Sequence, residues 1–242
     1  MQHYYHEKQL GENWFSYAPL YAHMVQRFPS SSRFVELGSW KGKSAAFMGV
    51  EIINSKKAIT MSCVDLWSNT LRVYPKQTLY GDALYQLFLA NISPVAEVIR
   101  VLRADTANVA DVFPDKSVQF VFIDGDHSYK GCHRDISAWL PKVADGGILA
   151  GHDYAWTTGI RSAMEDLCGD ENFSDPWFTG CFIAEIHDGR AKKFTLGVDT
   201  STNPWDKVFT LLMTTEVARY KCRPTSRGIL WCLSSENKHL TV

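Results

Sequence analysis

The segment that decides the fold is Val35-Glu36-Leu37-Gly38-Ser39-Trp40-Lys41-Gly42-Lys43-Ser44, where an apolar run meets a glycine turn and then a helical pattern. Glycines let a backbone approach a ligand closely, and the N-terminus of a helix offers free N–H groups and a positive dipole end to an anion. The segment therefore predicts a strand, a turn and a helix that together form a ligand site.

Alternating strand and helix patterns extend outward from this segment, from residue 33 to about residue 165. Such alternation is typical of a parallel sheet wrapped by helices. We therefore predict an α/β fold with a single doubly wound, mostly parallel, Rossmann-like sheet. The predicted strands are 33–37, 59–65, 97–102, 118–124 and 148–151, and the predicted helices are 44–53, 82–91 and 129–143.

The two flanks are less regular than this core. Residues 1–30 predict an N-terminal helical extension whose aromatic rings pack against the sheet, although a lid over the pocket or a dimer contact also fits them. Beyond Cys168, weaker patterns predict C-terminal strands and insertions. We expect one domain over residues 1–242, with its cofactor-binding core at 31–170 and, within 171–242, strands at 178–186 and 228–233 and a helix at 207–217.

Composition narrows the class of protein. The 242 residues are 45% hydrophobic, which suffices for one large core. With 25 basic and 26 acidic side chains, no overall field attracts nucleic acid or an anionic membrane, so we expect a small-molecule partner. No apolar run approaches the ~20 residues that span a bilayer, and the N-terminus lacks the apolar core of a signal peptide. We expect a cytoplasmic protein, and a homo-oligomer stays open.

Two other nucleotide-binding motifs resemble the glycine segment and fit it poorly. Gly38-x-x-x-Gly42-Lys43-Ser44 is one residue short of the phosphate loop, and the deletion should close the nest of N–H groups that holds a phosphate. Trp40 stands where the dinucleotide fingerprint requires its second glycine. A nucleoside-triphosphate-binding enzyme remains an alternative, as does a non-catalytic scaffold that keeps a nucleotide pocket.

Acidic residues follow the predicted strands in succession. Asp65 ends the second strand, Asp105 follows the third, and Asp124 ends the fourth. Ligands of open α/β sheets bind beyond the carboxyl ends of the strands, so these acids should share one rim of one pocket. At the end of the second strand an acid can accept hydrogen bonds from ribose hydroxyls.

Histidine and aspartate recur at two neighbouring strand ends, in Asp124-Gly125-Asp126-His127 and in His152-Asp153. If the strands are adjacent, Asp124, His127, His152 and Asp153 converge. They then offer oxygen and nitrogen ligands for a divalent ion, or a base for a substrate hydroxyl.

Three nearby polar residues are interpreted as structural. We expect Asp126 to cap the helix that begins near Tyr129, and we expect His133 and Asp135, inside that helix, to lie at the surface.

Four motifs together resemble a known family. Over residues 30–170 the chain resembles class I S-adenosylmethionine-dependent methyltransferases related to macrolide-sugar O-methyltransferases and cephalosporin-pathway enzymes. The motifs that carry this resemblance are Glu36-Leu37-Gly38-x-x-x-Gly42-x-Ser44, Asp65-x-Trp67, the segment 124–129 and the segment 146–154. The resemblance implies S-adenosyl-L-methionine as cofactor. It also implies methylation of an oxygen on a small polar metabolite, such as a sugar-like hydroxyl.

The resemblance also implies a role for each residue of the cofactor site. Gly38 and Gly42 would shape its methionine end, with Glu36 and Ser44 near the polar groups. The other implied cofactor contacts are Asp65 at the ribose, Trp67, Ala104 and Asp105 about the adenine, and Asp124, which is also counted as catalytic.

Metal dependence is the point at which this chain departs from those relatives. In the metal-using ones an Asp matching Asp124 and an acidic pair matching His152-Asp153 bind magnesium, and a His matching His127 acts as the base. Here His152 replaces a carboxylate, whereas magnesium prefers oxygen ligands. Magnesium, a softer ion such as manganese or zinc, and metal-free catalysis by His127 therefore stay open.

Overall fold

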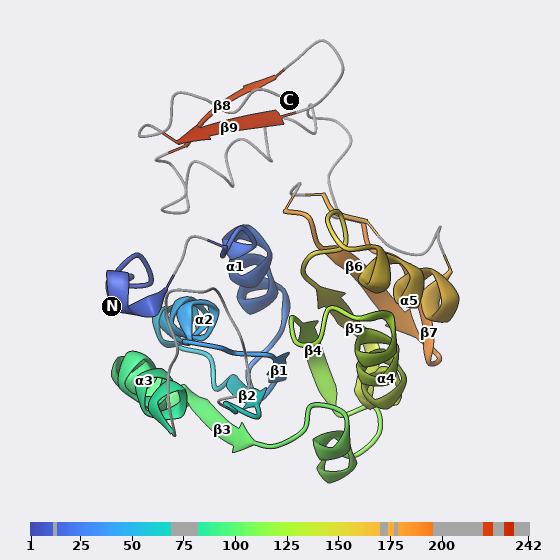
Figure 1. The fold of residues 1–242 in the computed structure, drawn as a ribbon, viewed down its shortest axis with the longest axis horizontal. Coiled ribbons are helices and arrows are strands. Elements are labelled where there is room, and N and C mark those ends of the chain that lie inside the picture. The colour runs from blue at the N-terminus through green and yellow to red at the C-terminus, as the bar shows by residue number, and fades with distance from the viewer. Residues whose placement is uncertain are drawn as a thin grey trace.

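A seven-stranded sheet forms the centre of the protein, in the order β3-β2-β1-β4-β5-β6-β7 (Figure 1). The computed structural model describes residues 1–11, 14–68, 82–169, 174–176 and 179–195, and the backbone of 220–224 and 230–234. Strands β1 to β5 are parallel, while β6 and β7 run antiparallel to their neighbours. The strands are β1 (Arg33–Leu37), β2 (Thr60–Asp65), β3 (Ile99–Arg103), β4 (Val118–Ile123), β5 (Val143–Gly151), β6 (Phe182–His187) and β7 (Arg190–Lys193).

Helices cover both faces of this sheet, as the predicted doubly wound fold requires (Figure 1). One face carries α1 (Ala18–Arg27), α2 (Lys43–Ser55) and α3 (Ala83–Ile92), and the other carries α4 (Tyr129–Trp139) and α5 (Thr158–Cys168). None of the helices in the described residues has the length and apolarity needed to cross a bilayer. Short 3-10 helices lie at η1 (Lys8–Leu10), η2 (Ser93–Val98), η3 (Asn108–Val112) and η4 (Leu140–Lys142).

The central strands are apolar along their whole length because both of their faces are covered. In β4, Phe120 and Phe122 pack on the side of α1 and α2, while Val121 and Ile123 pack on the side of α4 and α5. A doubly buried parallel strand reads as an unbroken apolar run for this reason.

Two predicted boundaries differ from the observed ones. β5 begins at Val143 rather than at residue 148, because Val143 already pairs with Val118. α4 ends at Trp139 rather than at residue 143, because the 3-10 helix η4 follows it.

The C-terminal predictions are partly confirmed. The expected strand at 178–186 corresponds to β6, and the one at 228–233 corresponds to β9 (Leu230–Ser234), which pairs antiparallel with β8 (Tyr220–Pro224). The helix predicted at 207–217 lies outside the described residues.

The N-terminal extension is helical and packs on the sheet, as predicted. The ring of Tyr21 in α1 meets the rings of Phe120 and Phe122 edge-on, with centroids 5.6 and 5.1 Å away. Its hydroxyl donates a 2.8 Å hydrogen bond to Glu36 in β1, and Ser39 donates another of 2.6 Å. Glu36 is fully buried, and these donors satisfy a carboxylate that would otherwise be costly to bury.

Replacing Gly38 by Ala should prevent the close approach of β1 and β4. Gly38 has a φ of +88°, and a Cβ there would overlap the carbonyl oxygen of Asp124. We expect a loss of about 3 kcal/mol or more in the free energy of unfolding, measured by urea denaturation. Gly146 is the matched control, because its φ is +75° but no atom lies within 4 Å of its Cβ position. Its Ala variant should lose only about 1 kcal/mol, and equal losses would contradict the crowding argument.

Replacing Glu36 by Gln should make stability less dependent on pH. Burial raises the pKa of Glu36 from 4.5 to about 7, against the opposing effect of its hydrogen bonds. A carboxyl group whose pKa is higher in the folded state stabilises that state fully at pH values below its pKa in the unfolded chain. This contribution is lost as the pH rises through its pKa in the folded state. Between about pH 5 and about pH 8 the variant should therefore gain up to about 3 kcal/mol relative to wild type. A stability difference that is the same at both pH values would show that the carboxyl titrates normally.

Candidate active site

A large pocket opens at the carboxyl ends of β1, β2, β4 and β5, where the strand order reverses between β1 and β4. Its cavity volume is about 1380 Å³. Typical small-ligand pockets have roughly 300–1,000 Å³, so this one has room for two ligands side by side. Its walls come from the N-terminal segment (residues 14–17), the glycine turn (residues 38–42) and the residues that follow β2 to β5.

The glycine turn is held directly against the neighbouring strands. Gly38 donates its N–H to the carbonyl of Val64 at 2.8 Å, and Asp124 donates its N–H to the carbonyl of Leu37 at 2.8 Å. Gly38 lines the pocket. Gly42, with a φ of +86°, faces the other way, because a Cβ there would meet Phe88 and Ile92 at 3.0 Å. Of the two predicted glycines, only Gly38 can therefore contact a ligand in this pocket.

Asp65 fixes two turns and also faces the pocket. Its Oδ2 accepts the N–H of Trp40 at 3.0 Å, and its Oδ1 accepts the N–H of Trp67 at 2.8 Å. Burial raises the pKa of Asp65, and these backbone hydrogen bonds oppose that effect. Asp65 is nevertheless only partly buried and lines the pocket, so a ligand's hydroxyl can reach its carboxylate.

Beneath the turn, Ser44 and Glu36 have separate positions. Ser44 lines the pocket at the start of α2 and is hydrogen-bonded to the carboxyl of Glu36. Glu36 does not line the pocket, so it supports the turn from below rather than meeting a ligand.

The structure separates the residues that were predicted about the adenine. Asp105 lines the pocket together with Thr106 and Arg134, and Arg134 pairs with its Oδ2 at 2.9 Å. Ala104 is partly buried against the α4 and α5 side of the core and does not line the pocket.

Trp67 is a core residue rather than a pocket residue. It is fully buried, its ring packs on Phe88 at 4.4 Å between centroids, and its Nε1–H donates to the carbonyl of Trp40. Leu66 and Ser68, on either side of it, line the pocket instead. The placement of Trp67 beside the adenine therefore needs correction: the indole anchors the loop, and its neighbours face the ligand space.

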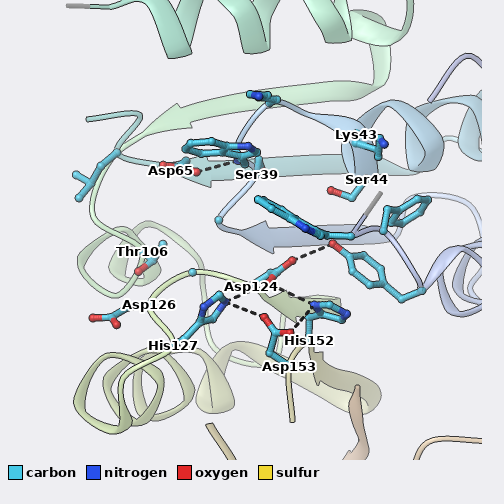
Figure 2. Close-up of a pocket in the computed structure, with 18 of the residues that line it drawn as sticks. Ser39, Lys43, Ser44, Asp65, Thr106, Asp124, Asp126, His127, His152 and Asp153 are labelled. Carbon is cyan, nitrogen blue, oxygen red and sulfur yellow. Dashed lines mark hydrogen bonds and ion pairs between the residues drawn. The ribbon is translucent and has the colours of Figure 1, made fainter. Parts of the chain in front are cut away.

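Asp124, His127, His152 and Asp153 converge as predicted, and Figure 2 shows them pointing toward one another. We call them the acid–histidine cluster. Nε2 of His127 lies 3.2 Å from Asp153 Oδ2 and 3.5 Å from Asp124 Oδ1. Nδ1 of His152 lies 3.3 Å from Asp153 Oδ1 and 3.9 Å from Asp124 Oδ1. The cluster lies across β4 and β5, which pair directly.

The electrostatics distinguish the two histidines of the cluster. A hydrogen bond to Asp124 raises the pKa of His127, whose side chain is 48% exposed toward the pocket. Burial would lower the pKa of His152, but Asp153 and Asp124 raise it overall, and this side chain is only 10% exposed. His127 can therefore meet a substrate, while His152 supports the cluster from behind.

The same cluster offers a donor set for a cation. One ligand atom each from Asp124, His152 and Asp153 lie within 4.8 Å of one another. Asp153 has a φ of +59°, a left-handed conformation that aspartate tolerates better than most residues and that is common at functional sites. Two carboxylate oxygens and one imidazole nitrogen fit manganese or zinc, and fit magnesium less well.

Two contacts of the N-terminal segment were not foreseen. Tyr17 donates its hydroxyl to Asp124 Oδ2 at 3.0 Å, and Ser16 Oγ lies 3.1 Å from His152 Nε2. The sequence signalled only that aromatic residues precede the first strand, since nothing local links residue 16 to residue 152.

Around α4, one structural expectation is wrong and one needs adjustment. Asp135 is fully buried and accepts a 2.7 Å hydrogen bond from Thr106, whereas we expected it at the surface. It shares the apolar stripe of Cys132, Ile136 and Trp139, and this helical spacing was the available signal.

The residue that caps α4 is Ser128, whose side chain accepts the N–H of Gly131. Asp126 instead accepts the N–H of Ser128 in the preceding turn.

Comparison with known proteins agrees with this architecture. Residues 35–154 match a family model described as a methyltransferase domain. The O-methyltransferase NovP superposes with a TM-score of 0.55 at 15% identity, covering 71% of this chain and 80% of that one. A protein from Corynebacterium glutamicum superposes with a TM-score of 0.51 at 16% identity, covering 75% and 82%. The uncharacterized protein y4gI of Sinorhizobium fredii is 26% identical over 121 residues, 50% of this chain and 13% of that protein.

The family match spans both halves of the pocket. Its segment begins inside β1, two residues before Leu37, contains the glycine turn and Asp65, and ends just after Asp153. The solved structures share the α/β fold, and the aligned segment makes up only a small part of y4gI. On this match, residues 35–154 form a methyltransferase domain, and the chain has the α/β fold of the O-methyltransferase NovP.

Proposed function

We propose that this protein transfers the methyl group of S-adenosylmethionine to an oxygen of a small polar metabolite, such as a sugar-like hydroxyl. The observation that carries the proposal is that one pocket holds the glycine turn, Asp65 and the acid–histidine cluster. The pocket thus combines a place for the cofactor with a basic group that faces the space beside it. NovP, which has the same fold, is named an O-methyltransferase, and this supports oxygen as the acceptor atom.

The cofactor would lie along the carboxyl edge of β1, β2 and β3. In this arrangement the methionine end lies against Gly38, the ribose hydroxyls donate to Asp65, and the adenine lies near Asp105, between Leu66 and Thr106. All of these residues line the pocket. Because Gly38 packs directly against Asp124, a cofactor held at Gly38 would have the acid–histidine cluster beside its methionine end.

His127 would act as the base. Its Nε2 faces Asp124 and Asp153, so these carboxylates favour the proton on Nε2 and leave Nδ1 as the basic atom. Nδ1 takes the proton of the acceptor hydroxyl while the oxygen forms its bond to the methyl carbon. The carbon–sulfur bond breaks, and its electron pair stays on the sulfur of S-adenosylhomocysteine. The two carboxylates stabilise the imidazolium that forms, and the pocket aligns the reacting atoms.

We further propose that Asp124, His152 and Asp153 hold a divalent ion that accepts imidazole, such as manganese or zinc. The compact donor set supports this. Such an ion, when bound, lowers the pKa of an acceptor hydroxyl.

The rim of the pocket suggests how an acceptor is held. Trp14 is 46% exposed, Leu66 is 51% exposed and Trp156 is 75% exposed, and all three line the pocket. Apolar surface exposed around a groove is typical of ligand-binding sites. We propose that these residues pack on the faces of a ring in a small-molecule acceptor.

The nucleoside-triphosphatase alternative is not favoured. In a phosphate loop the serine hydroxyl binds the magnesium ion, whereas here Ser44 is hydrogen-bonded to the buried Glu36. A non-catalytic scaffold differs from the proposed enzyme in needing no base, and the following variant distinguishes them.

Replacing His127 by Ala should abolish turnover and leave cofactor binding intact. Loss of a general base costs about 10²–10⁴-fold in rate. The rate is measured as S-adenosylhomocysteine released from S-adenosylmethionine with a panel of hydroxylated metabolites, and S-adenosylhomocysteine affinity is measured by calorimetry. His133→Ala is the control, because His133 lies on α4, where it contacts Ser137 and Tyr129 rather than the cluster. Full activity of His127→Ala would remove His127 from the mechanism.

Replacing Asp65 by Asn should weaken the binding of S-adenosylhomocysteine. Hydrogen bonds to a charged acceptor contribute about 1.5–3 kcal/mol, which corresponds to roughly tenfold to hundredfold in affinity. Asp126→Asn is the matched control, because Asp126 also lines the pocket but lies beside His127, away from the proposed ribose position. Circular dichroism checks that both variants fold. Equal affinities of the two variants would place the ribose elsewhere.

A further inference from the structure

Ser16 contacts the nitrogen of His152 that faces away from the two acids. Its Oγ lies 2.8 Å from the carbonyl oxygen of Thr179 and 3.1 Å from His152 Nε2. A carbonyl only accepts, so the single hydroxyl proton of Ser16 goes to Thr179. With its proton so placed, Oγ can accept a hydrogen bond from an Nε2–H of His152.

The other nitrogen of His152 faces two acids. With Nε2 bonded to Ser16, Nδ1 lies 3.3 Å from Asp153 Oδ1 and 3.9 Å from Asp124 Oδ1. Either a proton on Nδ1 or a bound cation can lie between the ring and these acids, and when a cation binds, Nδ1 must offer its lone pair while Nε2 keeps the proton that Ser16 accepts. The hydrogen bond on the far side of the ring therefore shapes the donor set on the near side.

The N-terminal segment holds a second member of the same set. Tyr17 donates its hydroxyl to Asp124 Oδ2 at 3.0 Å. This leaves Oδ1 of Asp124 as the oxygen that faces His152 and Asp153. Two consecutive residues thus orient two of the three ligand atoms from outside the cluster, as the outer hydrogen bonds of metal sites do.

We propose that Ser16 is a positioning residue that makes Nδ1 of His152 a metal donor and thereby gives the site a preference for manganese over magnesium. The inference rests on the proposed metal site, and it adds the residue that sets the tautomer and the kind of ion that results. Imidazole nitrogen is a good ligand for manganese, whereas magnesium prefers an all-oxygen set.

Binding of Mn²⁺ and Mg²⁺ to the 242-residue chain tests this proposal. Calorimetry is run on wild type, Ser16→Ala, Ser16→Thr and His152→Asp, and pulsed EPR of the Mn²⁺ complexes detects a coordinated ¹⁴N. Because Ser16 is exposed to the pocket, its substitution leaves the core intact. Wild type should bind Mn²⁺ more tightly than Mg²⁺ and show a ¹⁴N coupling.

The variants should separate positioning from ligation. Loss of an outer-shell hydrogen bond costs about 10–100-fold in metal affinity, so Ser16→Ala should lose this much for Mn²⁺ and less for Mg²⁺. Ser16→Thr keeps the hydroxyl and should retain both affinities. His152→Asp should lose the ¹⁴N coupling and most of the preference for Mn²⁺, since its donors are then all oxygen and suit both ions.

Three results would overturn the proposal, each in a different way. Unchanged Mn²⁺ affinity in Ser16→Ala would remove Ser16 from the site while leaving the metal in place. A ¹⁴N coupling that persists in His152→Asp would make another histidine the donor. No Mn²⁺ binding by wild type, in protein that still binds S-adenosylhomocysteine, would overturn this inference and the proposed ion but would leave the proposed methyl transfer standing.

Discussion

The close contact between Gly38 and Asp124 is the constraint on which the rest of the site depends. A side chain at position 38 would overlap the backbone of Asp124, so only glycine lets the end of β1 approach the residues that follow β4. The N–H of Asp124 bonds to Leu37 at the same place. This contact puts the glycine turn and the acid–histidine cluster on two sides of one pocket, where the strand order reverses. The two parts of the proposed site therefore face each other across this pocket.

The N-terminal segment and α1 join this contact to the interior. Tyr21 donates to the buried Glu36, Tyr17 donates to Asp124, and Ser16 bonds to His152. The first bond satisfies a carboxylate in the core, and the other two orient side chains that face the pocket. A single stretch of chain therefore contributes to stability and to the geometry of the site. Changes in its packing should alter the cluster even though it lies far away in the sequence.

The fold and the convergence of the cluster could be predicted because both follow from local pattern. Apolar runs mark the parallel strands, and residues that directly follow neighbouring strands, such as Asp124 and His152, must meet at one edge. The contacts of Ser16 and Tyr17 could not be predicted, since they join segments more than 100 residues apart. The burial of Trp67 could not be predicted, because sequence position locates a loop, whereas the direction of its side chain depends on packing against Phe88 in α3.

The most direct test of this account is calorimetric titration of the wild-type protein with S-adenosylhomocysteine, beside a titration with ATP and magnesium. We predict binding of S-adenosylhomocysteine in the micromolar range, because the pocket offers carboxylates for its ribose hydroxyls. We predict no detectable binding of ATP, because the glycine turn is too short to surround a phosphate. Folded protein that binds ATP and ignores S-adenosylhomocysteine would contradict it, and the glycine turn would then have to be a phosphate site.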